Sequence, residues 1–188
     1  FEGNLTRSPV DSIFQLLANE IHKEFVPFDS AGDTINLLNG EIQFQDSAWE
    51  VTPHDRTHYR TSCIPVAYDS EAKAPKFEMF LDQVFAGARH AESCRQLVLE
   101  MMGYSLLPTC RFEKFVILYG SGANGKSVLL RVLQALVGPK NVSSVQPSQL
   151  RDPFSRAHLR GKLANIVSEL SVGMPLADGE LKAIVSGE

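Results

Sequence analysis

The strongest constraint on the fold is a glycine-rich turn between two apolar segments. Residues 114–119, KFVILY, form a continuous apolar run, which predicts a strand buried on both faces of a parallel sheet. Residues 126–138, KSVLLRVLQALVG, have the length and apolar content of a helix that ends at a glycine. The turn between them has the spacing G-x-x-x-x-G-K-[ST], met by Gly120, Gly125, Lys126 and Ser127. The pattern therefore predicts a strand, a phosphate-binding loop and a helix in that order.

Phosphate binding explains each residue type in this loop. Backbone N–H groups must point at phosphate oxygens, which requires dihedral angles and close approach that glycine permits best. The helix N-terminus adds partial positive charge, Lys126 can reach the β- and γ-phosphates, and the Ser127 hydroxyl can ligate Mg²⁺. We therefore expect ATP and Mg²⁺ as cofactors. The residues expected to bind them are Gly120, Ser121, Gly122, Ala123, Asn124, Gly125, Lys126, Ser127 and Val128.

A phosphate loop also needs an acidic residue from a neighbouring strand, to hold Mg²⁺ through water or to polarise the attacking water. Glu169 ends the apolar run LANIVSEL, residues 163–170, which is a second candidate for a buried strand. No other acidic residue downstream of the loop ends such a run. We expect Lys126 and Glu169 to be catalytic, and Ser127 and Glu169 to hold the metal. The competing interpretation is that Glu169 only begins a solvated turn.

The first half of the chain follows a different pattern. Helical periodicity is present at residues 8–25, 77–87 and 91–107. Between the first two helices, Asn39-Gly40 separates two β-prone runs, which is a hairpin signal, and AWEV and CIPVAY are further strand candidates. Downstream of the loop, NVSSV predicts a short strand, PSQLRDPFSRAHLRGK predicts short helices and loops, and DGELKAIVSGE begins a helix or turn.

These patterns predict two domains. Residues 1–108 form an accessory domain that is helical with a small β insert, and residues 109–188 form the N-terminal part of an ATPase domain. The fold class is α/β, with a truncated parallel-sheet P-loop NTPase core preceded by a smaller mixed α+β domain. The chain stops inside a patterned segment, so we expect it to be part of a longer protein.

Composition limits the class of protein. The three cysteines show no CxxC spacing, which argues against a disulfide framework or a cysteine-based zinc site. His54, His58 and Cys63 have no fourth ligand at a familiar spacing, so a polar hairpin loop is the favoured interpretation there. No apolar stretch of about 18 residues and no signal peptide is present, so we expect a soluble protein in the cytoplasm of a bacterial host, without membrane contact.

Charge is unevenly distributed along the chain. Residues 1–108 carry 8 Lys and Arg against 16 Asp and Glu, whereas residues 109–188 carry 10 against 6. A basic second half suits a polyanionic ligand or partner. Its densest part is RDPFSRAHLRGK, residues 151–162, which is suited to nucleic acid phosphates, a neighbouring subunit or plain solvation.

Several segments together resemble the phage/plasmid primase-helicase family, relatives of the poxvirus helicase-primase. The second half contributes GSGANGKSVLLRVLQALVG, LRGKLANIVSEL and LKAIVSGE. The first half contributes INLLNGEIQF, TPHDRTHYRTSCIPVAYD, FLDQVF and LVLEMMGYSLLP, which resemble the smaller domain that precedes the family's ATPase core. Asn124 and the LRGK…SE sequence make the resemblance to this family more specific than the phosphate-loop motif alone would.

The resemblance implies a superfamily 3 helicase core with an AAA+-like fold. Such a protein forms a homo-hexameric ring around single-stranded DNA and couples ATP hydrolysis to unwinding during replication of a phage, plasmid or prophage. The family's first motif falls on Gly120 to Ser127 and its second, acidic motif on Glu169. Lys182 resembles the basic position in the segment leading to the family's DNA-contacting element, although a solvated surface lysine is the competing interpretation. A polar sensor residue and an arginine finger are expected after Glu188, and a primase domain before Phe1.

Three alternatives stay open at this point. A GTPase is disfavoured because the guanine-reading Asn-Lys-x-Asp element is missing, and a P-loop kinase would bring an acceptor-binding lid that we do not identify. The third is a nucleotide-binding module for oligomerisation or docking in a replisome, which binds nucleotide without turnover.

Overall fold

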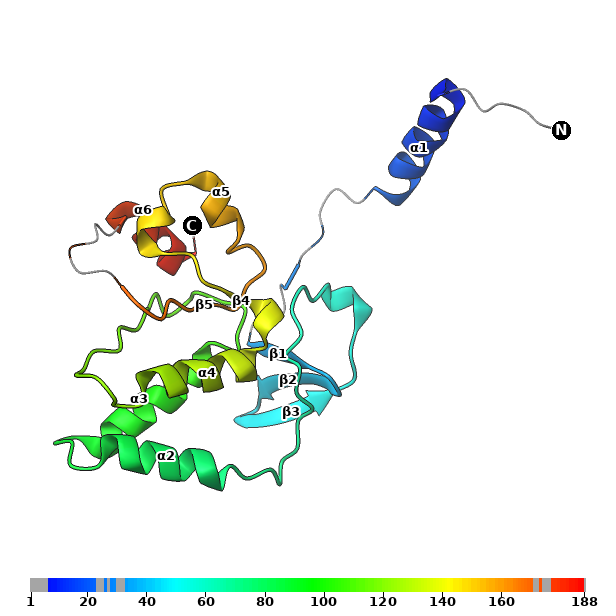
Figure 1. Ribbon diagram of the computed structural model, residues 1–188. Coiled ribbons are helices and arrows are strands. Elements are labelled where there is room, and N and C mark those ends of the chain that lie inside the picture. Colours follow the sequence, from blue (N-terminus) through cyan, green and yellow to red (C-terminus); the bar gives the residue numbers. More distant parts are fainter. Residues whose placement is uncertain are drawn as a thin grey trace.

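The computed structural model describes residues 7–22, 26, 28–29, 33–170, 173 and 177–187. Within these residues the chain is a mixed α/β protein with two separate sheets. One sheet is antiparallel and contains β1 (Thr34–Leu37), β2 (Gly40–Gln45) and β3 (Ala48–Thr52). The other is a short parallel pair of β4 (Val142–Ser143) and β5 (Ala164–Asn165). Figure 1 shows the two sheets in different layers of the molecule.

The predicted hairpin is confirmed. β1 and β2 join through Leu38 and Asn39, and Gly40 pairs with Leu37. A Cβ atom on Gly40 would lie 2.5 Å from the carbonyl oxygen of Thr52 on β3, so only glycine fits there. The expected strand CIPVAY is wrong beyond one bridge between Leu37 and Ile64, because the following Pro65 has no N–H to donate to a ladder.

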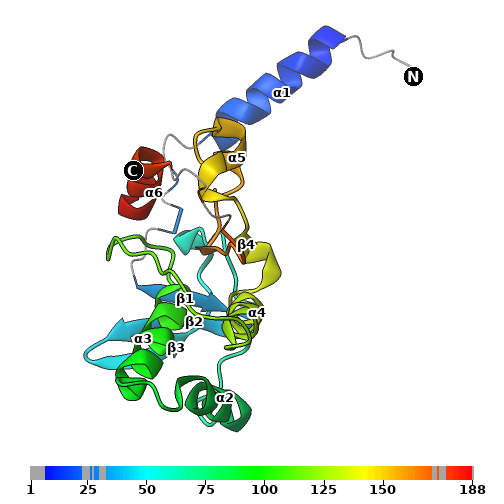
Figure 2. The same cartoon turned by 60° about the vertical axis from the view of Figure 1, so that its left-hand side comes forward.

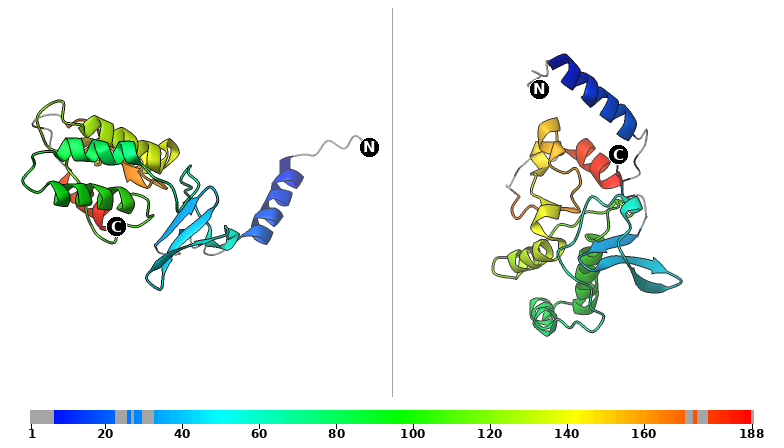
Figure 3. Two further views of the ribbon diagram at one scale, coloured as in Figure 1. Left: turned by 90° about the horizontal axis from the view of Figure 1, so that it is seen from below. Right: turned by 90° about the vertical axis from the view of Figure 1, so that its right-hand side faces the viewer.

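Three helices form the largest core. They are α2 (Pro75–Phe85), α3 (Ala91–Tyr104) and α4 (Lys126–Val137). The first two are predicted from periodicity, and α4 from its length and apolar content. The buried residues that join them are Leu81, Val98, Met102, Leu129, Leu133 and Val137. Figure 3 shows the three helices side by side at one end of the molecule, with the antiparallel sheet next to them. This core contains residues from both sides of the predicted boundary at residue 108.

α1 (Arg7–Ile21) confirms the first predicted helix over most of its length, and residues 23–25 of that prediction lie outside the described residues. Figures 1 and 3 show this helix apart from the sheets and the three-helix core. Its apolar side chains are exposed and not buried as core: Ile13, Phe14, Leu16, Leu17 and Ile21. Among the described residues, none of the helices has the length and apolar character needed to span a lipid bilayer.

The predicted strand at residues 114–119 is wrong. This segment joins no ladder, and Phe115, Val116, Ile117 and Tyr119 are exposed, the last of them by 98%. Within this segment only Leu118 is partly buried, and it packs against the three-helix core. An apolar run becomes a central strand only where strands on both sides accept and donate its backbone hydrogen bonds. The parallel sheet of the described residues contains only β4 and β5, so a larger parallel core is not formed there.

The remaining elements are short helices. They include the short 3-10 helices η1 (Arg56–His58), η2 (Pro139–Asn141) and η3 (Pro147–Gln149), and the helices α5 (Pro153–Ala157) and α6 (Asp178–Ser186). A small core of Val145, Leu150 and Ala177 joins the α5 segment to α6. Figure 2 shows α5 and α6 side by side above the antiparallel sheet. The predicted short strand in NVSSV and the predicted short helices that follow it are confirmed.

Candidate nucleotide-binding site

The glycine turn leads directly into α4. Gly125 precedes the helix and accepts its first backbone hydrogen bond, from Leu129 N at 2.9 Å. The N–H groups at the first positions of any α-helix have no acceptor within the helix. Here these positions are Lys126, Ser127 and Val128, and the helix dipole adds partial positive charge to them. This end of α4 is therefore electrostatically suited to an anion.

The ammonium group of Lys126 is folded back into the loop. Its Nζ donates to the carbonyl oxygens of Gly120 at 3.0 Å and Ser121 at 3.1 Å, and to Oδ1 of Asn124 at 2.6 Å. The three acceptors lie within six residues of the lysine, so the loop curls around its cation. A phosphate group that entered the loop would find this positive charge already in place.

The glycines of the loop have different steric roles. Gly125 has a φ of +81°, and a Cβ atom there would lie 2.7 Å from Cγ2 of Val84 on α2. Gly120 has no room for a Cβ either, because the amide group of Asn124 occupies the space. Nothing lies within 4 Å of the equivalent position on Gly122. Glycine is thus required at position 125 by its backbone conformation and by the packing of α4 on α2. At position 120 a Cβ atom would displace the Asn124 side chain, and at position 122 it would meet nothing.

Ser127 and Val128 lie on the first turn of α4 and are exposed. Ser127 directly follows the lysine, so its hydroxyl is presented at the same end of the helix. The hydroxyl of Ser127, the ammonium of Lys126 and the positive end of the helix dipole are therefore close together in sequence at the start of α4.

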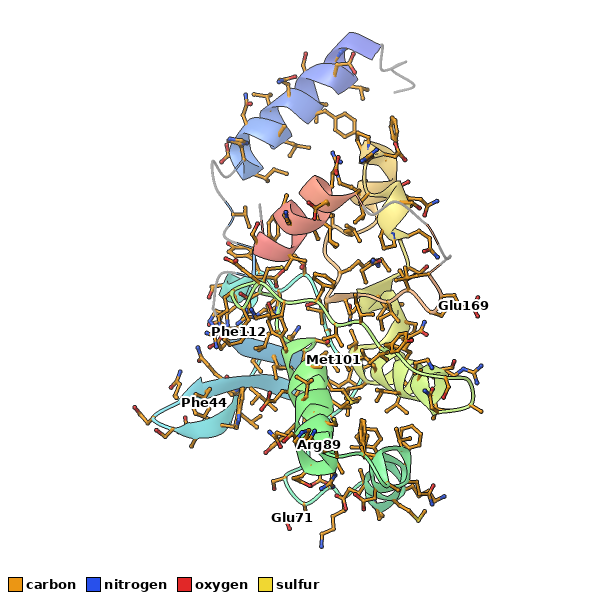
Figure 4. The ribbon with its side chains drawn as sticks, turned by 90° about the vertical axis from the view of Figure 1, so that its left-hand side faces the viewer. Phe44, Glu71, Arg89, Met101, Phe112 and Glu169 are labelled. Carbon is orange, nitrogen blue, oxygen red and sulfur yellow. The ribbon has the colours of Figure 1, made fainter. Side chains whose placement is uncertain are left out.

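Glu169 lies four residues after the end of β5 and is exposed. Figure 4 shows it at the same edge of the molecule as the loop before α4, and Figure 1 shows the segment after β5 on the same side as that loop. The predicted strand over 163–170 is confirmed only at Ala164 and Asn165, so Glu169 follows a strand without ending it. Lys182 lies on α6, where its Nζ contacts Asp178 at 2.9 Å, and both side chains are exposed.

Asn165 was not singled out by the sequence analysis. Its Oδ1 accepts from Ser143 Oγ at 2.9 Å and from Val145 N at 2.8 Å, while its Nδ2 donates to Val145 O at 2.9 Å. These bonds continue the β4–β5 pairing beyond its two-residue ladder. A polar residue inside an otherwise apolar run, LANIV, was the available signal.

Glu41 was also missed. It is 1% exposed on β2, forms an ion pair with Arg60 at 2.8 Å and is hydrogen-bonded to Nδ1 of His58 at 3.0 Å. Burial raises the pKa of the Glu41 carboxyl, but hydrogen bonds from His58, the Asp55 amide and Arg60 together hold the pKa below its ordinary value of 4.5. The cluster ties the polar segment TPHDRTHYR to the antiparallel sheet. His54 contacts the carbonyl oxygen of Leu37 instead, so the two histidines have different partners.

Two family models match parts of the chain. Residues 1–86 match the model described as D5 N terminal like, and residues 118–188 match a family of unknown function, DUF5906. The second match contains the whole glycine loop, Glu169 and Lys182. Both matches are consistent with the phage/plasmid primase-helicase family that the sequence resembles.

Proposed function

We propose that this chain is the nucleotide-binding part of an ATP-dependent DNA helicase of the primase-helicase kind. The single observation that carries the proposal is the position of Lys126, whose ammonium is encircled by the loop at the N-terminus of α4. The D5 N terminal like match in the first half supports the same assignment. The proposed partners are single-stranded DNA and further copies of the same chain in a ring.

The proposed chemistry is attack of water on the γ-phosphate of ATP. Lys126 and the amides at the start of α4 stabilise the charge that develops on the phosphate oxygens. Ser127 and Glu169 hold Mg²⁺, which neutralises charge on the β- and γ-phosphates. Glu169 also orients the attacking water, for which its exposed position after β5 leaves solvent access.

The test measures ATP binding and ATP turnover of the full-length protein, with and without single-stranded DNA. We expect Lys126→Ala to lower turnover by about 100-fold or more, because one preorganised donor to the transition state is removed. Glu169→Gln is expected to keep ATP binding and lose turnover. Lys76→Ala removes an exposed cation from α2 and serves as the matched control. Unchanged ATP binding and turnover in Lys126→Ala contradicts the proposal.

The second candidate is a nucleotide-binding docking module without turnover. The exposure of Glu169 favours it, since a catalytic carboxylate is usually held in a fixed position. Tight ATP binding that Lys126→Ala abolishes, combined with no hydrolysis and no strand separation at any DNA concentration, identifies this candidate. DNA-stimulated hydrolysis identifies the motor.

A further inference from the structure

We propose a second site on this chain, a surface over β4 and α5 that binds single-stranded DNA, with Phe154 stacking on a base and cationic side chains contacting phosphates. The proposal rests on the proposed function only in taking DNA as the polymer. It requires neither ATP nor the glycine loop. α4 separates the two sites: the loop precedes the helix and Lys140 follows it, and 12 residues of α-helix extend about 18 Å.

The site contains a hollow of about 490 Å³. Its lining residues come from two parts of the chain: residues 142–145, which include β4, and η3, α5 and the residues after α5. The polar side chains that line it are Ser143, Ser144, Gln149, Ser155, His158 and Lys162. The hydroxyls of Ser143 and Ser155 already donate to Asn165 and Asp152, which leaves Ser144, Gln149, His158 and Lys162 to bind a ligand. Donors of this kind suit the oxygens of a phosphodiester.

Charge favours a polyanion at this hollow. Between Ser127 and Ser168 the sequence contains six Lys and Arg residues and one acidic residue, Asp152. The Asp152 carboxylate is turned into α5, where it accepts from Ser155 N at 2.9 Å and Ser155 Oγ at 2.7 Å. Lys162 donates to the backbone carbonyl of Lys140, which brings two lysines 22 residues apart in sequence to the same place. Lys162, which lines the hollow, therefore brings positive charge to it, and Lys140 lies beside Lys162.

Phe154 lies on α5 and is 83% exposed. The residue that follows it, Ser155, lines the hollow, as does His158, the residue directly after α5. The segment already buries other apolar residues: Leu150 is 2% exposed, and Leu159 packs partly against the same small core. Phe154 therefore differs from the other large apolar residues of this segment, Leu150 and Leu159, which are packed against the small core.

Proteins bind single-stranded DNA through exposed aromatic rings and cationic side chains on the same surface. An unpaired base can stack on the face of an aromatic side chain, whereas the bases of a duplex stack on each other. Phosphate contacts from Arg151, Arg160 and Lys162, all exposed, add affinity that depends on salt. The antiparallel sheet presents another exposed aromatic pair, Phe44 and Trp49, but the residues around it are acidic: Glu50 and Asp46. A polyanion is therefore expected at α5 and not at the hairpin.

The test is fluorescence anisotropy of a labelled oligothymidine of about 16 nucleotides, measured against the full chain without ATP. Phe154→Ala and Phe154→Leu are expected to weaken binding about 10-fold, and Phe154→Tyr to retain it, because only the ring offers a stacking face. The double variant Arg151→Gln, Lys162→Gln is expected to reduce the slope of log affinity against log salt by about 1.4.

The controls are matched to these variants. Lys73→Gln with Lys76→Gln removes two exposed cations near the start of α2, and Phe44→Ala removes an exposed ring from the hairpin. Neither is expected to change oligothymidine binding. Circular dichroism establishes that every variant is folded.

Specific outcomes overturn the proposal. These are unchanged affinity in Phe154→Ala together with an unchanged salt slope in the double variant, or equal affinity of the wild-type chain for a duplex of the same length. Loss of self-association, with oligothymidine binding unchanged, would assign the surface to a protein partner instead. Lys126→Ala separates the two proposals: it is expected to lose ATP binding and keep oligothymidine binding, so either proposal can fail alone.

Discussion

Nζ of Lys126 lies 2.6 Å from Oδ1 of Asn124, and the amide of the same asparagine fills the space beside the Cα of Gly120. One side chain therefore links the first glycine of the loop to its lysine. It also competes with a phosphate for the lysine, because the ammonium must exchange at least one of its three acceptors when a phosphate binds. The loop is held closed around a cation by contacts that an anion can replace.

Asn124→Asp tests this exchange. The variant keeps the size of the side chain, strengthens its pairing with Lys126 and adds a negative charge that repels phosphates. We expect ATP affinity to fall about 10-fold, equivalent to about 1.4 kcal/mol, as measured by calorimetry. Gln134→Glu adds the same charge on an exposed position of α4 away from the loop, and its affinity is expected to match the wild type. Equal affinities in all three proteins contradict the proposed role of Asn124.

Gly125→Ala is expected to lower the free energy of unfolding by about 1–3 kcal/mol. The alanine would adopt a left-handed conformation at a φ of +81° and would collide with Val84 on α2. Gly122→Ala, three residues earlier in the same loop, meets no atom within 4 Å and is expected to change stability by less than about 0.5 kcal/mol. Urea denaturation measures both. A similar loss in both variants would mean that the packing of α4 on α2 does not depend on Gly125.

Asn165→Ala is expected to destabilise the protein by about 1–3 kcal/mol, because the N–H of the buried Val145 loses its acceptor. Hydrogen exchange provides the specific readout, since the Val145 amide should lose its protection while amides of α3 keep theirs. Ser144→Ala changes an exposed residue of the same segment and is the control. If the Val145 amide stays protected in Asn165→Ala, the backbone pairing of β4 and β5 is sufficient to protect it without the Asn165 side chain.

Glu41→Gln tests the buried ion pair of the antiparallel sheet. At neutral pH we expect a loss of about 3 kcal/mol, because Arg60 remains buried without its anionic partner. The folded-state pKa of Glu41 is lowered, so its contribution is present above the ordinary value of 4.5 and is lost as pH falls through the folded-state value. The difference in stability between wild type and variant should therefore shrink as pH falls below 4.5. Glu50→Gln, on the exposed strand β3, is the control. If the difference in stability between wild type and Glu41→Gln does not change with pH, the buried carboxylate of Glu41 does not stabilise the fold through its charge.

The sequence predicted the elements whose signals are local. The Asn39-Gly40 hairpin, the three core helices and the short strand at β4 were all expected, and all are present. Their determinants lie within a few residues: turn geometry, apolar periodicity, and glycine or proline at helix ends. Lys126 illustrates this best, because its three acceptors come from the loop that precedes it.

The elements that depend on distant partners were predicted less well. The apolar run at residues 114–119 has the composition of a central strand, yet it joins no ladder, because composition cannot supply neighbouring strands. α1 has the expected periodicity, but its apolar face lies against no core. Periodicity defines which face of a helix is apolar and leaves open what covers it.

The sequence by itself determined the glycine loop, the helix that follows it and the hairpin, since these depend on backbone conformations that neighbouring residues impose. Only the tertiary structure decided that Asn165 joins β4 to β5, that Glu41 is buried with Arg60, and that Phe154 is exposed on a helix that helps to line a polar hollow. The physical reason is that burial and pairing depend on side chains brought together from distant parts of the chain. For Glu41 and Arg60 that separation is 19 residues, which no local pattern encodes.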